Sequence, residues 1–325
     1  MTARLVGLLL LAFVTLGASL LVGGVDLAPG AIFNALAHPH ASADVTIVWQ
    51  LRLPRVVIAA AVGLELSVAG ALLQGMLRNP LVDPYLTGVS AGAAAAITLA
   101  IVAGVAAPLI PGIGFIAGLG AALLVASLAR RGAGLDANRL ILAGVSLSAL
   151  FSAFIALILT RGQSADYAAE IISWLAGSMA GRGWNDLALS LPYAGGGLIL
   201  AALAVPMLNA LRVGTVRAAA AGVNVDRAQW LLLASAALLT ASAVALAGMV
   251  GFVGLIVPHL ARRIVGSDAR VLVPACALLG MTLCMLADAA ARTLVAPAEL
   301  PVGVLLAFIG VPTFLYLYLR GGVAA

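Results

Sequence analysis

The 325-residue sequence has few side chains that could carry chemistry, and their spacing does not suggest an enzyme. No His–Glu or Ser–His pair stands at a spacing typical of an active site. All 17 basic residues are arginine. A Walker A phosphate-binding loop requires a lysine. The chain therefore cannot carry that ATP site, and any ATP hydrolysis has to come from another chain.

The cysteines and histidines do not predict a metal or redox centre. Cys276 and Cys284 are eight residues apart in one predicted helix, which separates them by about 12 Å, too far for a disulfide. We interpret them as small core residues. His38 and His40 stand in a predicted outer loop, where they could contact metal or haem, although a solvated loop is favoured.

Glu65 is the most unusual residue, because it falls at the midpoint of a long apolar segment. A charged carboxylate at the centre of a bilayer costs at least a few kcal/mol. Three roles remain open for it. The carboxyl could hydrogen-bond a neighbouring helix, face a wet transport path, or couple transport to protons.

The composition indicates that these residues belong to a membrane protein. Hydrophobic residues make up 64% of the chain, charged residues 9%, and the mean hydropathy is +1.18, whereas soluble domains have about 25% charged residues. About 20 apolar residues cross a bilayer as a helix. We predict an all-α polytopic membrane protein, a single domain over 1–325, with spans near 5–23, 55–77, 88–107, 113–129, 140–160, 187–208, 230–250, 252–265, 271–292 and 303–319.

The distribution of arginine predicts the topology through the positive-inside rule. With ten crossings, twelve arginines fall inside and five fall outside. We therefore expect both termini in the cytoplasm and two five-helix halves. Segment 252–265 is too short to cross unaided, and a short helix near 167–177 is expected to lie at the outer surface or to re-enter the membrane. The outer arginines are Arg52, Arg55, Arg161, Arg182 and Arg292; Arg320 is among the inner ones.

Several long motifs resemble one transporter family. They are "RLPR", "GALLQGMLRNPLVDPYLTGVSAGA", "RLILAGVSLSA", "GFVGLIVPHLARRIVGSDARVLVP" and "ELPVGVLLAFIGVPTFLYL". They are similar to the FecCD-type permease subunits of binding-protein-dependent ABC importers, which take up iron–siderophore complexes, haem and cobalamin. The resemblance covers nearly the whole chain, in order.

The resemblance implies the partners. Two permease copies form a homodimer in the bacterial inner membrane, two ATPase subunits with ATP and Mg bind from the cytoplasm, and a periplasmic binding protein delivers the ligand. It implies no cofactor, no metal and no nucleic acid on this chain. We rank iron–siderophore complexes first as substrate, then haem, then cobalamin. A proton-coupled secondary transporter is a remote alternative.

The resemblance also implies roles for particular residues. Outward arginines of the family contact acidic residues of the binding protein, and Arg52, Arg55 and Arg292 match them. The alternatives are contact with lipid headgroups or, for Arg292, an i,i+4 pair with Asp288.

On the cytoplasmic side, Asn79 and Leu81 match one gate of the family, and Ala137 and Asn138 match the other. Asn138 could equally be a helix N-cap. Arg217, Ala218, Ala219 and Gly222 match the segment that couples to the ATPase, with Gly222 placed between two short helices. Relatives carry acidic residues just before that glycine, whereas this chain has Thr215, Val216 and Arg217.

Overall fold

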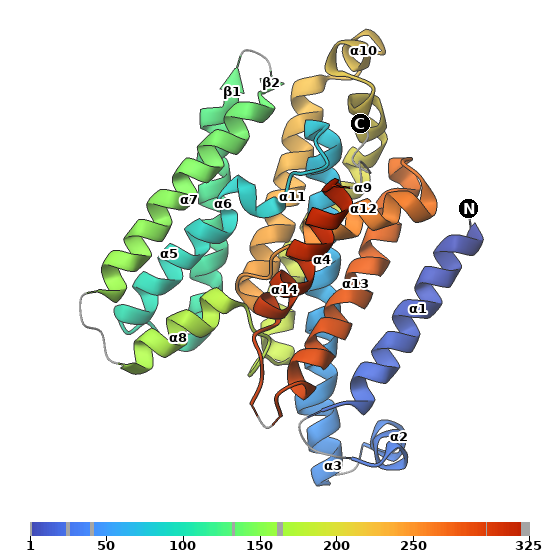
Figure 1. Cartoon of the computed structure of the whole chain (residues 1–325), viewed down its shortest axis with the longest axis vertical. Coiled ribbons are helices and arrows are strands. Elements are labelled where there is room, and N and C mark those ends of the chain that lie inside the picture. Colours follow the sequence, from blue (N-terminus) through green and yellow to red (C-terminus); the bar gives the residue numbers. More distant parts are fainter. Residues whose placement is uncertain are drawn as a thin grey trace.

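The computed structural model of the chain is a bundle of long helices (Figure 1). It describes residues 2–23, 27–39, 42–131, 134–160, 165–296 and 298–319. Within these residues the strands are limited to a two-residue antiparallel ladder, so the predicted all-α class is confirmed apart from it. The helices are α1 (Thr2–Leu21), α2 (Pro29–Ala37), α3 (Ala43–Thr46), η1 (Ile47–Arg52), α4 (Leu53–Leu77), η2 (Pro84–Thr87), α5 (Val89–Val102), η3 (Ala107–Leu109), α6 (Ile110–Ala129), α7 (Ala137–Leu159), α8 (Ala165–Ala176), α9 (Trp184–Arg212), α10 (Thr215–Ala220), α11 (Val225–Ala247), α12 (Val253–Val265), α13 (Ala269–Thr293) and α14 (Val302–Leu319); the strands are β1 (Arg130–Arg131) and β2 (Gly134–Leu135).

Each predicted span corresponds to a helix, but their lengths differ. Within the described part of the chain, seven helical stretches are long and apolar enough to cross a bilayer. The 13 residues of α12 extend about 20 Å, so this helix is too short to cross, as the sequence predicted. The predicted span 88–107 was wrong in length, because α5 ends at Val102. Gly104 at φ +69° ends it, with its N–H bonded to Ile101 and that of Val105 to Ala100, in a Schellman motif.

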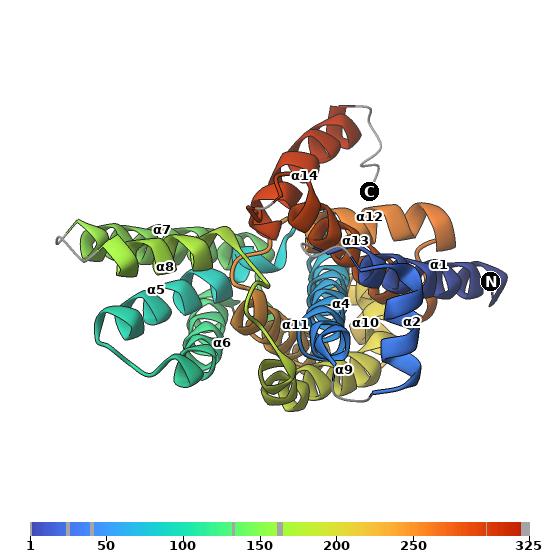
Figure 2. The same cartoon turned by 90° about the horizontal axis from the view of Figure 1, so that it is seen from below.

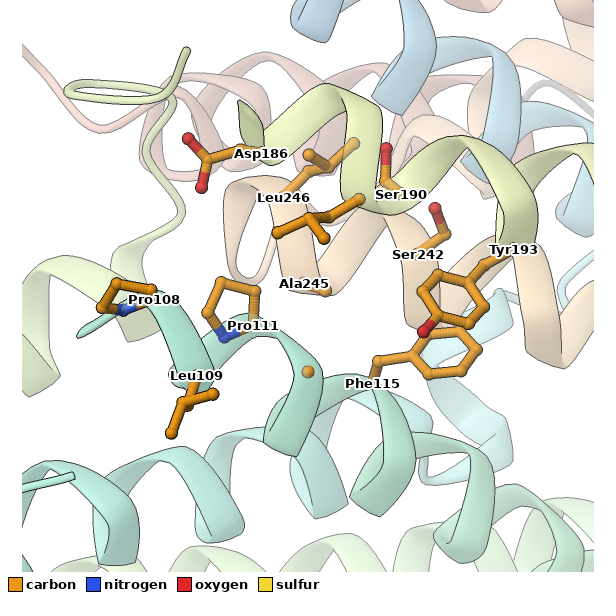
Figure 3. A pocket seen from close by; sticks show the side chains of 12 residues that line it. Pro108, Leu109, Pro111, Phe115, Asp186, Ser190, Tyr193, Ser242, Ala245 and Leu246 are labelled. Carbon is orange, nitrogen blue, oxygen red and sulfur yellow. The ribbon is translucent and has the colours of Figure 1, made fainter. Parts of the chain in front are cut away.

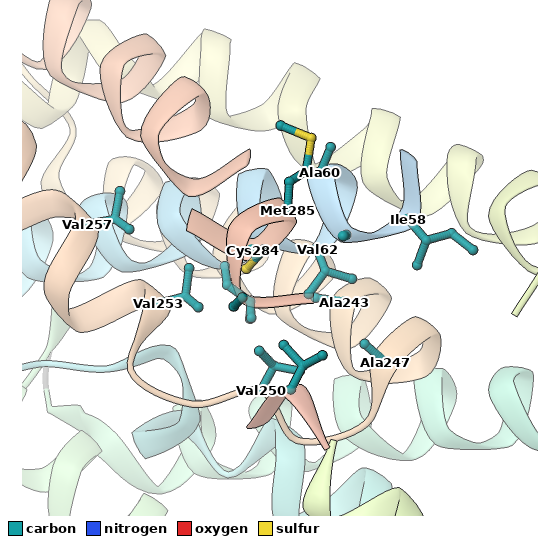
Figure 4. Packing of buried hydrophobic residues seen from close by; sticks show 14 of the residues in the cluster. Ile58, Ala60, Val62, Ala243, Ala247, Val250, Val253, Val257, Cys284 and Met285 are labelled. Atoms are coloured by element: carbon teal, nitrogen blue, oxygen red, sulfur yellow. The ribbon is translucent and has the colours of Figure 1, made fainter. Parts of the chain in front are cut away.

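α4 is the central helix of the bundle, with α13, α11, α12 and α9 packed around it (Figures 1 and 2). Its 25 residues are apolar nearly all round, which is typical of a helix buried on every side. Small side chains let its neighbours approach closely (Figure 4). Gly63 of α4 and Gly280 of α13 face each other so closely that a methyl group on either would overlap the other's carbonyl oxygen.

The helices α5, α6 and α7, with α8, form a group on one side of the bundle (Figures 1 and 2). The two expected five-helix halves do not pack separately, because α1 and α4 of the first half both pack on α13 of the second half. α7 is the least covered long helix: 11% of its apolar stretch is buried, against 83% for the stretch that contains α4. Leu142 and Leu150 of α7 are each about two-thirds exposed.

The start of α1 and the end of α14 both lie toward the end of the bundle that carries α10 (Figure 1). There Arg4 Nη1 donates to the Ile264 carbonyl at the end of α12, 2.7 Å away. Nearby, the Asn209 side chain donates to Asp268 Oδ1, which caps α13, and this bond lowers the pKa of the exposed Asp268 carboxyl. We refer to this end as the inner end and to the opposite end, with α2 and α3, as the outer end.

We predict that Gly280→Ala lowers the free energy of unfolding by about 1–3 kcal/mol, because the added methyl would separate α4 from α13. Thermal unfolding of the purified protein measures the effect. The control is Gly120→Ala on the exposed face of α6, where nothing lies within 4 Å of an added Cβ. Equal stability of the two variants would contradict the tight α4–α13 contact.

Candidate functional site

Two of the outer arginines bind the carboxyl end of α1. Arg52 Nη1 donates to the carbonyls of Leu20 (2.8 Å) and Leu21 (3.2 Å). Arg292 donates to those of Val22 (2.9 Å) and Ser19 (3.2 Å). The last four carbonyls of a helix have no partner within the helix, and cations are favoured there. Both side chains are buried, so these two arginines act as a cap for α1.

Arg55 joins an ion-pair network beside this cap. Its Nε lies 2.9 Å from Oδ1 of Asp288, whose side chain is fully buried. Its Nη1 lies 2.9 Å from Glu299 Oε2. Asp288 also pairs with Arg292 at 3.0 Å, which confirms the i,i+4 pair that the sequence left open. The Arg55 side chain is 12% exposed, which is more than that of Arg292.

Arginines of the cap and of the network line a cleft of about 360 Å³ at the outer end. Four arginines and one carboxylate line it: Arg52, Arg55, Arg182, Arg292 and Glu299. The structure thus brings together the three arginines matched to docking. Sequence analysis did not assign Glu299 to this site, because Glu299 lies in the loop after α13, where no helical periodicity indicates which way a side chain points. Arg161, also expected outside, and Arg320, expected inside, lie outside the described residues.

Two segments of irregular backbone meet inside the bundle. The turn 78–88 follows α4, and the segment 248–252 separates α11 from α12. The Tyr85 hydroxyl accepts a hydrogen bond of 2.7 Å from the Val250 N–H. A methyl group added at Gly254 would overlap Pro84, so the two segments are in close contact.

The first gate segment, Asn79–Leu81, is fixed by two amide side chains. Asn79 Oδ1 accepts from the Leu81 N–H at 2.9 Å, closing a tight turn. The buried Gln74 donates to the carbonyls of Val82 (3.1 Å) and Gly254 (3.0 Å), and its Oε1 accepts from Arg262 of α12 at 2.8 Å. Leu81 itself is 37% exposed.

The second gate segment begins α7. Asp136 is the N-cap, accepting from the Arg139 N–H at 3.0 Å. The alternative that Asn138 caps this helix is therefore wrong. Ala137 is the first residue of α7 and Asn138 is an exposed second residue. Ala137 packs against the apolar cluster that contains Leu77 and Val82, so both gate segments lie at the inner end.

The segment matched to ATPase coupling projects from the inner end (Figure 1). Arg217, Ala218 and Ala219 belong to the six-residue α10; Ala218 is buried, whereas Arg217 and Ala219 are exposed. Gly222 adopts φ +82°, a conformation suited to glycine, and links α10 directly to the long α11. The expected second short helix is not present as a separate element. Val216 is the most exposed apolar residue of the segment, at 82%.

Glu65 lies in the interior of the bundle, 1% exposed, facing Ser242 of α11. Its Oε2 and the Ser242 Oγ are both buried without a hydrogen bond of good geometry. Glu65 thus lies between α4 and α11, whereas the exposed apolar face of the bundle belongs to α7. This position favours a structural role for Glu65 over a role in the transport path. Cys276 and Cys284 are buried in α13, as expected. His38 bonds the Asn34 side chain at 3.1 Å, and His40 lies outside the described residues.

Comparison with known proteins gives this fold a context. The chain matches the FecCD transport family over residues 9–320. It is 38% identical to the hemin transport system permease protein HmuU of Yersinia pestis, over 96% of this chain and 94% of that protein. It is 42% identical to the cobalamin import system permease protein BtuC of Halobacterium salinarum, over 83% and 73%.

A solved structure described as a metal-chelate type ABC transporter, in an inward-facing conformation, superimposes with a TM-score of 0.83. It is 33% identical in sequence, and the match covers 98% of this chain and all of the other. These similarities extend from α1 to α14. The chain is therefore an integral membrane permease subunit of an ABC transporter, rather than an enzyme, and it belongs to the FecCD transport family.

Proposed function

We propose that the chain is the permease of an ATP-driven importer that moves an iron–siderophore complex from the periplasm to the cytoplasm. The observation that carries this proposal is the whole-length likeness to a metal-chelate type transporter. Ten crossings with both termini cytoplasmic, in the bacterial inner membrane, complete the proposal. Haem and cobalamin are the alternative substrates, in keeping with the names of two relatives.

The proposed partners are a second copy of the chain, two ATPase subunits that hold ATP and Mg, and a periplasmic binding protein. The uncovered apolar face of α7 supports a transport path formed between two copies of the chain. A path along an exposed face has to be enclosed by a second surface opposite it. A proton-coupled secondary transporter stays a remote alternative. Its only support is Glu65, which lies away from that face.

The outward cleft supports docking of the binding protein, with Arg55 as the main contact. Arg52 and Arg292 are committed to α1, whereas Arg55 is partly exposed and holds Glu299, whose side chain is 39% exposed. An acidic group of the partner could replace Glu299 at Arg55. Charge pairs at a wet rim chiefly set the rate and orientation of encounter.

We predict that Arg55→Glu abolishes stimulation of ATP hydrolysis by the binding protein, and that Glu299→Gln preserves or strengthens it by leaving Arg55 to the partner. The measurement is ATPase activity of the reconstituted complex in liposomes, across candidate chelates. Arg139→Glu, an exposed charge at the inner end, is the control. Normal stimulation of Arg55→Glu would exclude docking at this cleft, whereas absence of ATP-driven uptake by wild type for every chelate would contradict the proposed function.

The coupling segment leads to a second prediction. Since its Thr215–Arg217 stretch carries no acidic residue, we expect α10 to bind the ATPase by apolar packing. Val216→Asp would place a charge in that contact and weaken assembly about tenfold or more, without changing thermal stability, because the side chain is exposed. Co-purification with the ATPase measures this. Val213→Asp, also exposed but before the helix, is the control. Equal retention of the ATPase by both would contradict apolar coupling through α10.

A further inference from the structure

We propose that a cavity between α6, α9 and α11 binds a small lipophilic amine. The cavity has a volume of about 220 Å³ and shares no lining residue with the outer cleft or the gate segments. Residues of η3, α6, α9 and α11 surround it (Figure 3). They are Pro108, Leu109, Pro111, Gly112, Phe115, Asp186, Leu189, Ser190, Tyr193, Ser242, Ala245 and Leu246.

Two buried polar atoms at this cavity lack partners. Ser242 lines the cavity and is fully buried; its Oγ faces Oε2 of Glu65, and neither atom makes a hydrogen bond of good geometry. A serine hydroxyl has one donor and two acceptor positions. If Ser242 donates to Glu65, it can still accept one bond from the cavity. A ligand that donates would therefore fill the remaining acceptor position of Ser242.

The charges around the cavity favour a cation as that donor. None of the residues that line it is basic. Asp186 is a carboxylate among them; its Oδ1 lies 3.4 Å from Arg182, a residue of the outer cleft, and its Oδ2 accepts from the Gly183 N–H at 2.9 Å. The rings of Phe115 and Tyr193 stack with their centres 3.9 Å apart, and aromatic faces attract cations. An ammonium group has three donors and no acceptor, whereas a carboxylate only accepts. An amine suits this site and an anion does not.

The route by which a ligand would reach the cavity implies that the ligand carries an apolar tail. Leu109 and Leu189, at the edge of the cavity, are 61% and 60% exposed, and in a bilayer such side chains face lipid. Pro108, Pro111, Ala245 and Leu246 provide apolar walls. A ligand that enters from the lipid and places an ammonium group near Ser242 must carry a short hydrocarbon chain. This inference does not depend on the proposed function.

The test uses the full-length permease in lipid nanodiscs with three probes of equal chain length: hexylammonium, hexanol and hexanoate. Thermal unfolding at increasing probe concentration gives the apparent Kd, corrected for partition into empty nanodiscs. We expect hexylammonium to bind about tenfold more tightly than hexanol, and hexanoate not to bind. Ser242→Ala and Glu65→Gln should each remove that preference.

The control is Ser235→Ala, a buried serine of the same helix that bonds the Gly197 carbonyl away from the cavity. It should keep the preference for hexylammonium. The proposal is overturned if the three probes stabilise the protein only in proportion to their partition. It is also overturned if Ser242→Ala binds hexylammonium as wild type does, an outcome that can be read even if Glu65→Gln fails to fold.

A second inference, which rests on the proposed function, concerns how the ATPase reaches the inner gate. We infer that Gln229 transmits movement of α10 to the second gate segment. Gln229 lies one turn into α11, directly after the Gly222 turn that joins α10 to this helix. Its Oε1 accepts from the Leu135 N–H at 2.8 Å, and Leu135 stands two residues before Ala137.

The burial of this bond makes it a rigid connection. Gln229 is 4% exposed and Leu135 is 8% exposed, so water does not replace the bond when it breaks. Leaving a buried N–H without an acceptor is costly. The short β1–β2 ladder therefore has to follow the start of α11. An ion pair between Arg130 and Asp226 runs parallel to it, but at 4.0 Å and largely exposed it contributes little.

The test compares uptake per ATP hydrolysed in the reconstituted complex. Gln229→Leu should keep binding-protein-stimulated hydrolysis while uptake per ATP falls about tenfold, the cost of one buried hydrogen bond. Gln229→Glu keeps an acceptor for the Leu135 N–H and should restore coupling. Thr240→Val, which removes another buried hydroxyl bond on α11, is the control and should keep the wild-type ratio.

A wild-type ratio of uptake to ATP hydrolysis in Gln229→Leu would overturn this inference. Equal losses of hydrolysis and uptake together with a lowered Tm would also overturn it, because a merely structural role of Gln229 gives that result. If wild type itself shows no ATP-dependent uptake, the proposed function fails instead. The two failures are thus distinguishable.

Discussion

The interior of a bilayer offers the backbone no water to hydrogen-bond, and this constraint decides where the chain can leave helical geometry. The chain leaves helical geometry after α4 and between α11 and α12, and these two irregular segments lie against each other. Gln74 and Tyr85 satisfy buried carbonyl and N–H groups there that lack a partner within a helix. The helices can be interrupted at this point because polar side chains from neighbouring segments replace water.

The same constraint gives a reason for arginine at the end that the sequence predicts to face outward, against the positive-inside rule. The end of α1 leaves carbonyls that need donors, and Arg52 and Arg292 supply them from two other elements. Asp288 then balances the charge of Arg292 and orients Arg55. Helix capping and the proposed partner recognition therefore share one network, in which the buried arginines position the one that is partly exposed.

The sequence predicted those parts of the fold that depend on local pattern. Apolar runs of helical length located a helix at each predicted span, and glycine and proline marked the turns after α4 and α10. The missed features depend on contacts between distant residues. Gln74 meets Gly254, 180 residues away, and Gln229 meets Leu135, 94 residues away. Neither glutamine has a spacing that reveals its partner. The end of α5 was missed although Gly104 signals it, because the apolar run continues past that glycine.

The fold separates a rigid part from a part that can move. α4 and α13 meet through glycines and share a continuous core, so neither can shift without opening that core. α8 and α14, by contrast, meet the break after α11 through backbone contacts at Gly177, Gly248 and Gly303. Side chains of α14 nevertheless join the core that α4 and α13 share, since Val302 and Leu306 belong to it. Of the long helices described, α7 is held least by packing, with 11% of its apolar stretch buried, so it can shift at the smallest cost to the contact between α4 and α13.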